Sequence, residues 1–220
     1  MTKPLIEYLQ VGEYRVLTYL LACPATRQGV LIDPAGEEER LVALVRDQGV
    51  KLKYILNTHA HPDHTLGNDA LKAEFNVPVA FHRADNDFFA SPEGIEVAMG
   101  ELGLRPPSPA DSLLEDGQVL TVGQLEIKVI HTPGHSPGSV CFLVGDHLFT
   151  GDTLFVGAAG RTDLGGSSLE TLLESIETKI LTLPDETVIH PGHDYGESPF
   201  STLAREREEN IYITDFILDP

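Results

Sequence analysis

The chain has 220 residues and a formal net charge of −19, from 34 acidic and 15 basic residues. This length suits one large domain or two small ones, and we expect a single domain over residues 1–220. The negative charge disfavours a nucleic-acid partner, because an acidic surface repels the phosphate backbone. No stretch approaches the roughly 18 apolar residues of a membrane span, and the first residues lack the apolar core of a secretory signal. We therefore expect a cytoplasmic protein with no membrane partner.

The first half of the chain alternates predicted strands and helices. Apolar, β-branched runs predict strands at residues 13–23, 29–35, 52–58 and 77–82. Helical spacing of apolar residues predicts helices at residues 37–49 and 68–76. The run at 29–35 is nearly all apolar, which is typical of a strand that is buried on both faces.

Residues 83–112 give the weakest pattern. They hold one short helical stretch at residues 94–103. The prolines that follow it, in LRPPSPADS, exclude regular structure.

Two hairpins follow. The first joins strands at 118–123 and 125–132 around Gly123-Gln124, and the second joins strands at 139–144 and 147–153 around Gly145-Asp146. Each turn contains a glycine between two apolar runs, as a tight hairpin requires.

The last part of the chain predicts a helix, a strand and a closing helix. Residues 167–184 have helical spacing, and Ser167 and Glu170 are spaced as in a capping box. TVIHPG at 187–192 reads as the final strand. Ser198 and Pro199 suit the cap and the first position of the closing helix.

The order of these elements indicates the fold class. Strands followed by a helix in each half predict an α/β fold with two sheets face to face and helices outside. A single open parallel sheet is the alternative. Cys23 and Cys141 lie in apolar runs, and we expect both to be buried free thiols.

The segment His59-Ala60-His61-Pro62-Asp63-His64 comes directly after a predicted strand. In an extended stretch side chains alternate, so His59 and His61 point the same way and can share one metal ion. Where the chain turns into the next element, Asp63 and His64 can reach a second ion. Neither pair completes a tetrahedron, so further ligands must come from later in the chain.

Three later loops offer those ligands, each at a strand end. They are TPGHSPGS with His135, FTGDTLF with Asp152 and IHPGHDYG with His193. A glycine beside each lets the backbone approach closely.

The remaining histidines and Asp33 give less definite signals. His131 and His190 suit either hydrogen bonding to ligands or a satisfied place in the core. His82 and His147 have no obvious partner, and we expect them to be structural or exposed. Asp33 ends a buried strand, where it can orient a ligand histidine or cap a turn.

HAHPDH at residues 59–64, followed in order by His135, Asp152 and His193, resembles the metallo-β-lactamase superfamily. The resemblance covers nearly the whole chain. It implies an α/β fold of four layers, an αββα sandwich, with the metals at one edge of the sheets.

The resemblance also implies how the ligands are divided. The first metal would be held by His59, His61 and His135. The second would be held by Asp63, His64 and His193. Asp152 would bridge both with a water or hydroxide, which makes Asp63 and Asp152 the candidate catalytic residues. The expected cofactors are two divalent ions, with zinc first and iron or manganese as alternatives.

Within the superfamily, GRTDLGG (160–166), LLESIETKILTLP and PGHDYG look like glyoxalase II-type and persulfide dioxygenase-type proteins. The first likeness implies a metallo-hydrolase that cleaves a hydroxyacylglutathione-type thioester by a metal-bridging hydroxide. The second implies a mononuclear iron persulfide dioxygenase that acts on glutathione persulfide, with His59, His135 and Asp152 as the facial ligand set. A lactonase or esterase, or a non-catalytic metal-binding module, is a minor alternative.

Two other branches are disfavoured by single positions. The commonest zinc β-lactamases carry Cys where Asp152 stands. The diiron flavoproteins of this fold commonly carry Glu where His61 stands.

The expected partner is a small molecule, a glutathione or other thiol conjugate, and a homodimer is left open. Arg161 is the candidate for gripping a substrate carboxylate, because its planar fork matches a carboxylate. An internal ion pair with Asp163 explains Arg161 equally well. Tyr195 can line the substrate pocket, and an ordinary packed tyrosine is the alternative.

Overall fold

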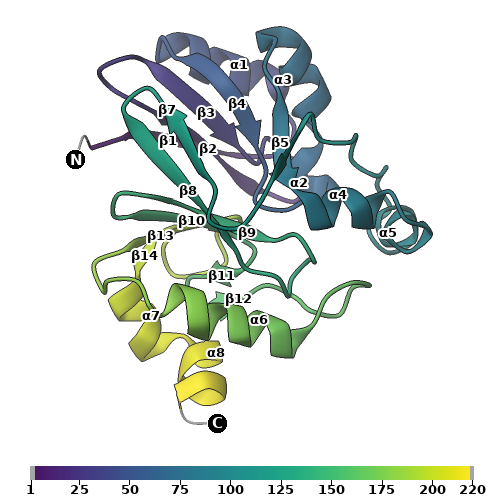
Figure 1. Ribbon diagram of the computed structural model, residues 1–220, viewed down its shortest axis with the longest axis vertical. Coiled ribbons are helices and arrows are strands. Elements are labelled where there is room, and N and C mark those ends of the chain that lie inside the picture. The colour runs from purple at the N-terminus through teal and green to yellow at the C-terminus, as the bar shows by residue number, and fades with distance from the viewer. Residues whose placement is uncertain (1–2, 219–220) are drawn as a thin grey trace.

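Two six-stranded sheets lie face to face, with helices on the outer side of each (Figure 1). The structure, a computed structural model, describes residues 3–218. In Figure 1 helices α1 and α3 cover the first sheet, and α6, α7 and α8 lie on the far side of the second. This is the four-layer αββα sandwich that we expected, and the alternative of one open sheet is wrong.

The first sheet is built from the N-terminal half of the chain. Its strands, in spatial order, are β1 (Leu5–Val11), β2 (Val16–Ala22), β3 (Gln28–Ile32), β4 (Lys51–Leu56), β5 (Val79–His82) and β6 (Ser112–Leu114). β1 to β3 pair antiparallel, whereas β3 to β6 pair parallel. The carboxyl ends of the parallel strands therefore meet at one edge of the sheet.

Helices connect the parallel strands of the first sheet. α1 (Glu38–Asp47) joins β3 to β4, and α2 (Pro62–Thr65) and α3 (Asn68–Phe75) join β4 to β5. The connection from β5 to β6 contains α4 (Arg83–Phe89), α5 (Pro92–Glu96) and the wider π-type helix η1 (Val97–Glu101). Such crossovers are what parallel strands require.

The second sheet comes from the C-terminal half. Its strands, in spatial order, are β14 (Ser201–Thr202), β13 (Val188–Pro191), β10 (His147–Gly151), β9 (Val140–Val144), β8 (Leu125–His131) and β7 (Val119–Val122). Both predicted hairpin turns are confirmed, because Val122 pairs with Leu125 and Val144 pairs with His147. The remaining elements are β11 (Leu154–Phe155), β12 (Ala158–Ala159), α6 (Leu169–Ser175), η2 (Ile176–Ile180), α7 (Leu203–Glu209), α8 (Ile211–Ile213) and η3 (Thr214–Leu218).

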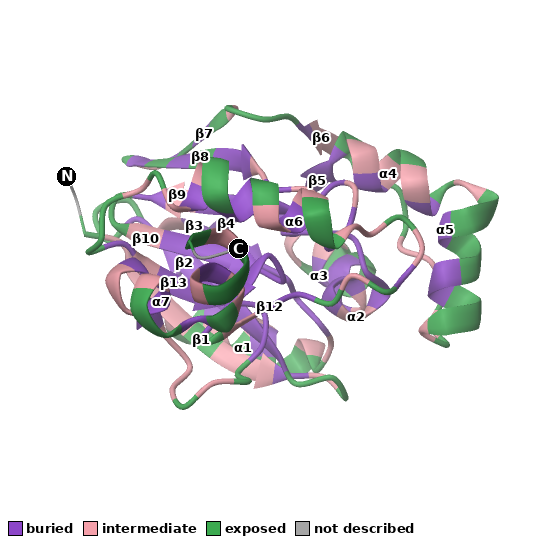
Figure 2. Cartoon of the chain, turned by 90° about the horizontal axis from the view of Figure 1, so that it is seen from below, coloured by how far each residue is buried: buried purple, intermediate pink, exposed green. Residues whose placement is uncertain are grey.

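Three apolar clusters fill the spaces between the layers. The cluster between the sheets includes Tyr19, Ile32 and Phe142. A second packs the first sheet against α1, α3 and α4, and a third packs the second sheet against α6 and α7. β3 contributes Leu31 to the outer cluster and Ile32 to the inner one, so the strand is buried on both faces as predicted. Figure 2 shows the consequence, with buried strands and helices that are exposed on their outward side.

Several element boundaries differ from those predicted. β1 and α4 were not predicted, and the strand expected at 13–23 begins at Val16 after a turn. Ser168, not Ser167, caps α6, with its side chain accepting from the Thr171 N–H. The closing helix begins at Leu203 with Thr202 as its cap, so the assignment of Ser198 and Pro199 is wrong. Several residues near the start of a helix can form the same cap hydrogen bond, and packing against the rest of the protein decides which of them caps the helix.

Two simpler expectations concern cysteines and membranes. Cys23 and Cys141 are both free and buried, as predicted. Over residues 3–218, none of the helices has the length and apolar character that a bilayer crossing needs.

Candidate metal centre

All seven candidate ligands come together at one edge of the sandwich, where strands of both sheets end. Residues 59–64 follow β4 of the first sheet. His135 lies between β8 and β9, Asp152 directly follows β10, and His193 follows β13 of the second sheet. An isolated bridge between Val16 and His193 ties the last of these loops to the first sheet. The centre therefore straddles the two sheets.

The first group of donors contains His59, His61 and His135, which offer ring nitrogens within 4.8 Å of one another. His61 Nδ1 lies 2.9 Å from His135 Nε2. His59 and His61 do share one group, in agreement with the alternation of side chains in an extended segment.

The second group contains Asp63, His64 and His193, again within 4.8 Å. His64 Nε2 lies 3.3 Å from His193 Nε2 and 3.7 Å from Asp63 Oδ2. Two nitrogen ligands at about 2.0–2.1 Å from one ion lie about 3.3–3.4 Å apart in a tetrahedron. The spacing of the two rings therefore suits a shared ion.

Asp152 lies between the two groups. Its Oδ1 is 3.4 Å from His64 Nε2, and its Oδ2 is 3.7 Å from His135 Nε2 and 3.5 Å from His193 Nε2. One carboxylate thus faces both sets of donors, which is the position that a bridging ligand needs.

Some buried polar atoms of this cluster lack hydrogen-bond partners among the described residues. His59 Nε2 and Asp152 Oδ1 are two of them. A buried polar atom without a partner costs about 1–3 kcal/mol, and a bound cation would satisfy both atoms. Imidazole and carboxylate donors suit zinc, iron and manganese. The residues present therefore fit a metal-binding cluster.

The outward-facing ring nitrogens are held by other groups. His135 Nδ1 lies 2.8 Å from the Arg161 carbonyl oxygen, to which it can only donate. His64 Nδ1 lies 3.2 Å from Asp33 Oδ2. These contacts orient each ring so that its Nε2 faces the centre. Of the two roles weighed for Asp33, orientation of a candidate ligand is the one that the geometry supports.

The electrostatics of the cluster follow from burial and from its carboxylates. Burial, reinforced by neighbouring histidines, holds the pKa values of His59 and His61 well below the ordinary value. Burial would also lower the pKa of His64, but the carboxylates of Asp152, Asp63 and Asp33 outweigh it and raise that pKa to about 10. A cation entering the second group must therefore displace a proton from His64 at neutral pH.

Close backbone approach is needed at two glycines beside the centre. A Cβ at Gly192 would lie 2.3 Å from Asp152 Oδ1 and 2.9 Å from His64 Cε1. A Cβ at Gly160 would lie 1.9 Å from the Asp152 carbonyl oxygen. A side chain at either position would displace a candidate ligand.

A cavity of about 130 Å³ opens onto the centre. Five of its lining side chains come from the candidate ligands, and the others are Tyr14, Leu102, Leu104, Arg161, Leu164 and Tyr195. Ligand pockets commonly measure about 300–1,000 Å³, so only a small reacting group fits beside the donors. The remainder of a bound molecule would lie against the apolar side chains that line the cavity, Leu102, Leu104 and Leu164.

Arg161 and Tyr195 lie at the mouth of this cavity. Arg161 forms a two-bond ion pair with Asp163, at 2.6 and 2.8 Å, which is the alternative that we weighed for it. Tyr195 stacks on His193 with ring centroids 4.9 Å apart and planes 7° apart, and 67% of it is exposed. Both residues can reach a bound molecule, and both also have a structural partner.

One buried carboxylate beside the centre, Asp85 of α4, was not among the predicted site residues. Burial raises its pKa to about 6, against the opposing effect of hydrogen bonds from Ala60, Ser136 and Gly138. Asp85 lies in the polar stretch HRADND, which gives no sign of burial.

The other histidines form two pairs. The rings of His82 and His131 stack with centroids 3.9 Å apart, and His131 Nε2 donates to the Pro137 carbonyl oxygen over 2.9 Å. His147 Nδ1 lies 2.9 Å from His190 Nε2. His82 and His147 therefore do have partners, which single-residue patterns could not reveal.

The sequence profile of the Metallo-beta-lactamase superfamily matches residues 11–193, the span that contains every candidate ligand. The chain belongs to this superfamily. Among curated superfamily members, the Probable metallo-hydrolase YqgX of Bacillus subtilis is 34% identical over 96% of this chain and 98% of its own length.

Two further relatives differ in their stated activities. Persulfide dioxygenase ETHE1 of Bos taurus is 36% identical over 90% of this chain and 71% of its own length. Hydroxyacylglutathione hydrolase GloC of Haemophilus influenzae is 32% identical over 85% of this chain and 88% of its own length. Both branches of the expected resemblance are thus represented among the relatives of this superfamily member.

Solved structures of the superfamily share the fold. The crystal structure of BLEG-1 B3 metallo-beta-lactamase has a TM-score of 0.86 and 34% identity, covering 96% of this chain and all of that one. The structure of TTHA1623 in a di-iron-bound form has a TM-score of 0.78 and 36% identity, covering 93% of this chain and 98% of that one.

Proposed function

We propose that this superfamily member is a dinuclear metallo-hydrolase that cleaves thioesters of the hydroxyacylglutathione type. The observation that carries the proposal is the pair of three-donor groups with Asp152 between them. A structural zinc site is closed by about four ligands. Seven donors shared between two ions leave coordination positions for water and substrate.

Each of the two ions is assigned to one of the two groups of donors. The first ion is assigned to His59, His61 and His135. The second is assigned to Asp63, His64 and His193. Two ions in these groups would lower the pKa of a shared water towards about 7 and polarise the thioester carbonyl. Zinc suits the histidine-rich donor set, and the di-iron form of TTHA1623 supports iron as an alternative.

The chain's own side chains would orient the reaction. Asp152 faces both groups and can hold a water between them, and Asp63 lines the cavity on the side of the second group. Asp33 and the Arg161 carbonyl fix the rings of His64 and His135, so the donors need not reorganise as charge develops. Leu102, Leu104 and Leu164 line the cavity and would limit the access of bulk water to the reacting carbonyl.

The substrate class rests on the relatives and on the cavity mouth. Similarity to Hydroxyacylglutathione hydrolase GloC supports a glutathione or related thiol conjugate. Arg161 is the cation that lines the cavity, and its guanidinium can exchange Asp163 for a substrate carboxylate. Tyr195 offers a flat face beside His193 against which the thiol carrier can lie.

A second candidate function is that of a persulfide dioxygenase. His59, His135 and Asp152 are two histidines and a carboxylate, the set that leaves three iron positions open. The similarity to Persulfide dioxygenase ETHE1 favours this candidate. It uses part of the same donor set, so the metal stoichiometry separates the two functions.

The deciding experiment combines metal analysis with two assays on the purified protein. We expect two ions per chain and hydrolysis of S-lactoylglutathione. One iron per chain, with oxygen uptake on glutathione persulfide and no thioester cleavage, would overturn the hydrolase.

The same assay tests the substrate role of Arg161. Arg161→Ala should raise KM for the glutathione thioester with kcat nearly unchanged, because a remote carboxylate contact contributes to binding before the reaction. Arg83→Ala is the matched control, since Arg83 is equally exposed and also forms an ion pair, with Glu115. Equal effects of the two variants would remove Arg161 from the site.

A further inference from the structure

The carboxylate of Asp85 is fully buried and accepts three hydrogen bonds. Its Oδ2 accepts from the Ala60 N–H over 2.7 Å and from the Ser136 hydroxyl over 2.9 Å. Its Oδ1 accepts from the Gly138 N–H over 2.5 Å. Hydrogen bonds to an ionised acceptor are among the stronger ones in proteins.

The three donors belong to the two loops that carry the first group. Ala60 lies between His59 and His61, just after β4 of the first sheet. Ser136 directly follows His135, and Gly138 lies two residues further on, before β9 of the second sheet. One carboxylate from α4 therefore joins the His59–His61 segment to the His135 loop.

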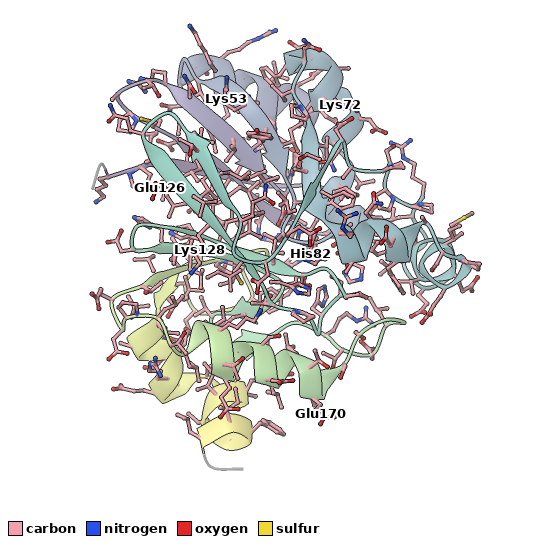
Figure 3. All side chains as sticks on the ribbon, in the orientation of Figure 1. Lys53, Lys72, His82, Glu126, Lys128 and Glu170 are labelled. Atoms are coloured by element: carbon pink, nitrogen blue, oxygen red, sulfur yellow. The ribbon has the colours of Figure 1, made fainter. Side chains whose placement is uncertain are left out.

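Other contacts fix α4 against the His135 loop. His82, marked in Figure 3, caps α4 by accepting from the Ala84 N–H, and its ring stacks on His131. His131 donates in turn to Pro137. A Cβ at Gly138 would lie 2.5 Å from the Asp85 nitrogen, so the loop approaches α4 as closely as a glycine allows. Asp85 cannot move away without breaking this packing.

We propose that Asp85 is a positioning residue for the first metal ion, acting through the backbone of both loops that supply its histidines. The second group does not depend on this carboxylate in the same way. Its His64 is oriented by Asp33, and its His193 lies in the loop after β13. Loss of Asp85 should therefore weaken the two ions unequally.

Asp85→Asn is the sharpest test, because it keeps the size of the side chain and removes one acceptor. In either orientation the amide NH₂ would face a backbone N–H, that of Gly138 or that of Ala60, and two donors cannot form a hydrogen bond with each other. Loss of a partner outside the ligand set typically costs about 10–100-fold in metal affinity. We expect a loss of this size for one ion and a much smaller loss for the other.

The experiment is a zinc titration of chelator-treated protein in competition with a chromophoric chelator, which resolves the two affinities. Anomalous diffraction from crystals with one equivalent of zinc then shows which position is filled. Wild-type protein should show the first position filled at least in part, and Asp85→Asn should fill the second. This inference rests on the two-ion arrangement proposed above. The titration measures metal binding without turnover, so it tests the inference even if the protein does not cleave the thioester.

Controls separate positioning from general destabilisation. Asp111→Asn changes another carboxylate that accepts from a backbone N–H, that of Val79, away from the ligand loops. It should leave both affinities unchanged. If Asp85→Asn proves unstable, Ser136→Ala removes one of the three hydrogen bonds and should weaken the same ion less. Equal weakening of both ions, or loss of the second alone, in either variant would overturn the proposal.

Discussion

Two sets of histidines in this protein invite comparison, the five buried ones of the candidate metal centre and the pair of half-buried His147 and buried His190. His147 begins β10 and His190 lies within β13, whereas the histidines of the metal centre follow the ends of strands. Burial lowers the pKa of His190 to about 3, as it also lowers the pKa values of His59 and His61. Both sets also include a buried ring nitrogen without a hydrogen-bond partner among the described residues. Burial and an unpaired nitrogen therefore do not distinguish a metal centre from a core.

The difference lies in what faces the rings. In the metal centre, the outer nitrogens of His64 and His135 contact fixed oxygen atoms, and the inner nitrogens converge with carboxylates. In the pair, the rings of His147 and His190 form a hydrogen bond with each other, and the His190 ring stacks on Phe149. Across the described chain, every group of three or more converging donors includes a histidine from residues 59–64. Convergence of three donors, with carboxylates, is the informative feature.

The largest expected effect tests the centre itself. His61→Ala removes a donor from the first group, so activity should fall by more than the roughly 10–100-fold that loss of an outer partner costs. The thermal stability of the variant, measured after its metal ions are removed with a chelator, should change far less than its activity. Asp85 still holds the backbone of the loop by its hydrogen bond from Ala60. Turnover and melting temperature are the measurements, and near wild-type turnover would remove His61 from the ligand set.

A middle-sized effect is expected where an outer contact is altered. Asp33→Asn weakens the acceptor that faces His64 Nδ1 and should lower the affinity of the second ion about 10–100-fold. The first ion should be affected less, because Asp33 reaches His59 only through the Thr58 hydroxyl. This variant is therefore the counterpart of Asp85→Asn in the same zinc titration. If Asp33→Asn weakened the binding of the first ion alone, the assignment of Asp33 to the second ion would be wrong.

The smallest effect on activity is expected in the histidine pair. His190→Phe should leave metal content and kcat/KM near those of the wild type, because His190 lies among aromatic rings away from the cavity. At neutral pH the variant should lose about 1–3 kcal/mol of stability, since His147 Nδ1 loses its partner.

Acid should reverse the sign of that stability difference. The folded pKa of His190, about 3, lies below the unfolded value of about 6.5, so the unfolded chain binds the proton first as the pH falls. The wild type therefore loses up to about 1.4 kcal/mol per pH unit through this group between those values, and the Phe variant does not. Urea unfolding at pH 7 and pH 4 measures both terms. An unchanged difference between the two pH values would contradict the low folded pKa.

Sequence patterns predicted the layers and the metal cluster better than they predicted the element ends. The buried strand β3 and both hairpin turns follow from apolar runs and glycine-containing turns, which are local signals. The convergence of His135, Asp152 and His193 with residues 59–64 was implied by the resemblance to the superfamily, and the structure brings these residues together where strands of both sheets end. Local patterns do not give the order of the strands, so they could not predict this convergence alone.

The misses have a common physical cause, which is dependence on distant residues. The closing helix begins at Leu203 because its cap, Thr202, pairs with β13, whereas Ser198 offers the same cap chemistry without that pairing. Asp85 is buried because loops from both sheets surround it, and its own neighbours in sequence are polar. The spacing of apolar residues along the sequence therefore does not reveal that Asp85 is buried.

The position of the centre across two sheets has a consequence for how the protein acquires its metals. The donors of residues 59–64 are synthesised well before His135, and His193 comes later still. In the proposed arrangement neither ion has its full ligand set until the second sheet has folded against the first. Metal loading is then a late event in biogenesis, and chains that take up both ions are those in which the two halves have already docked.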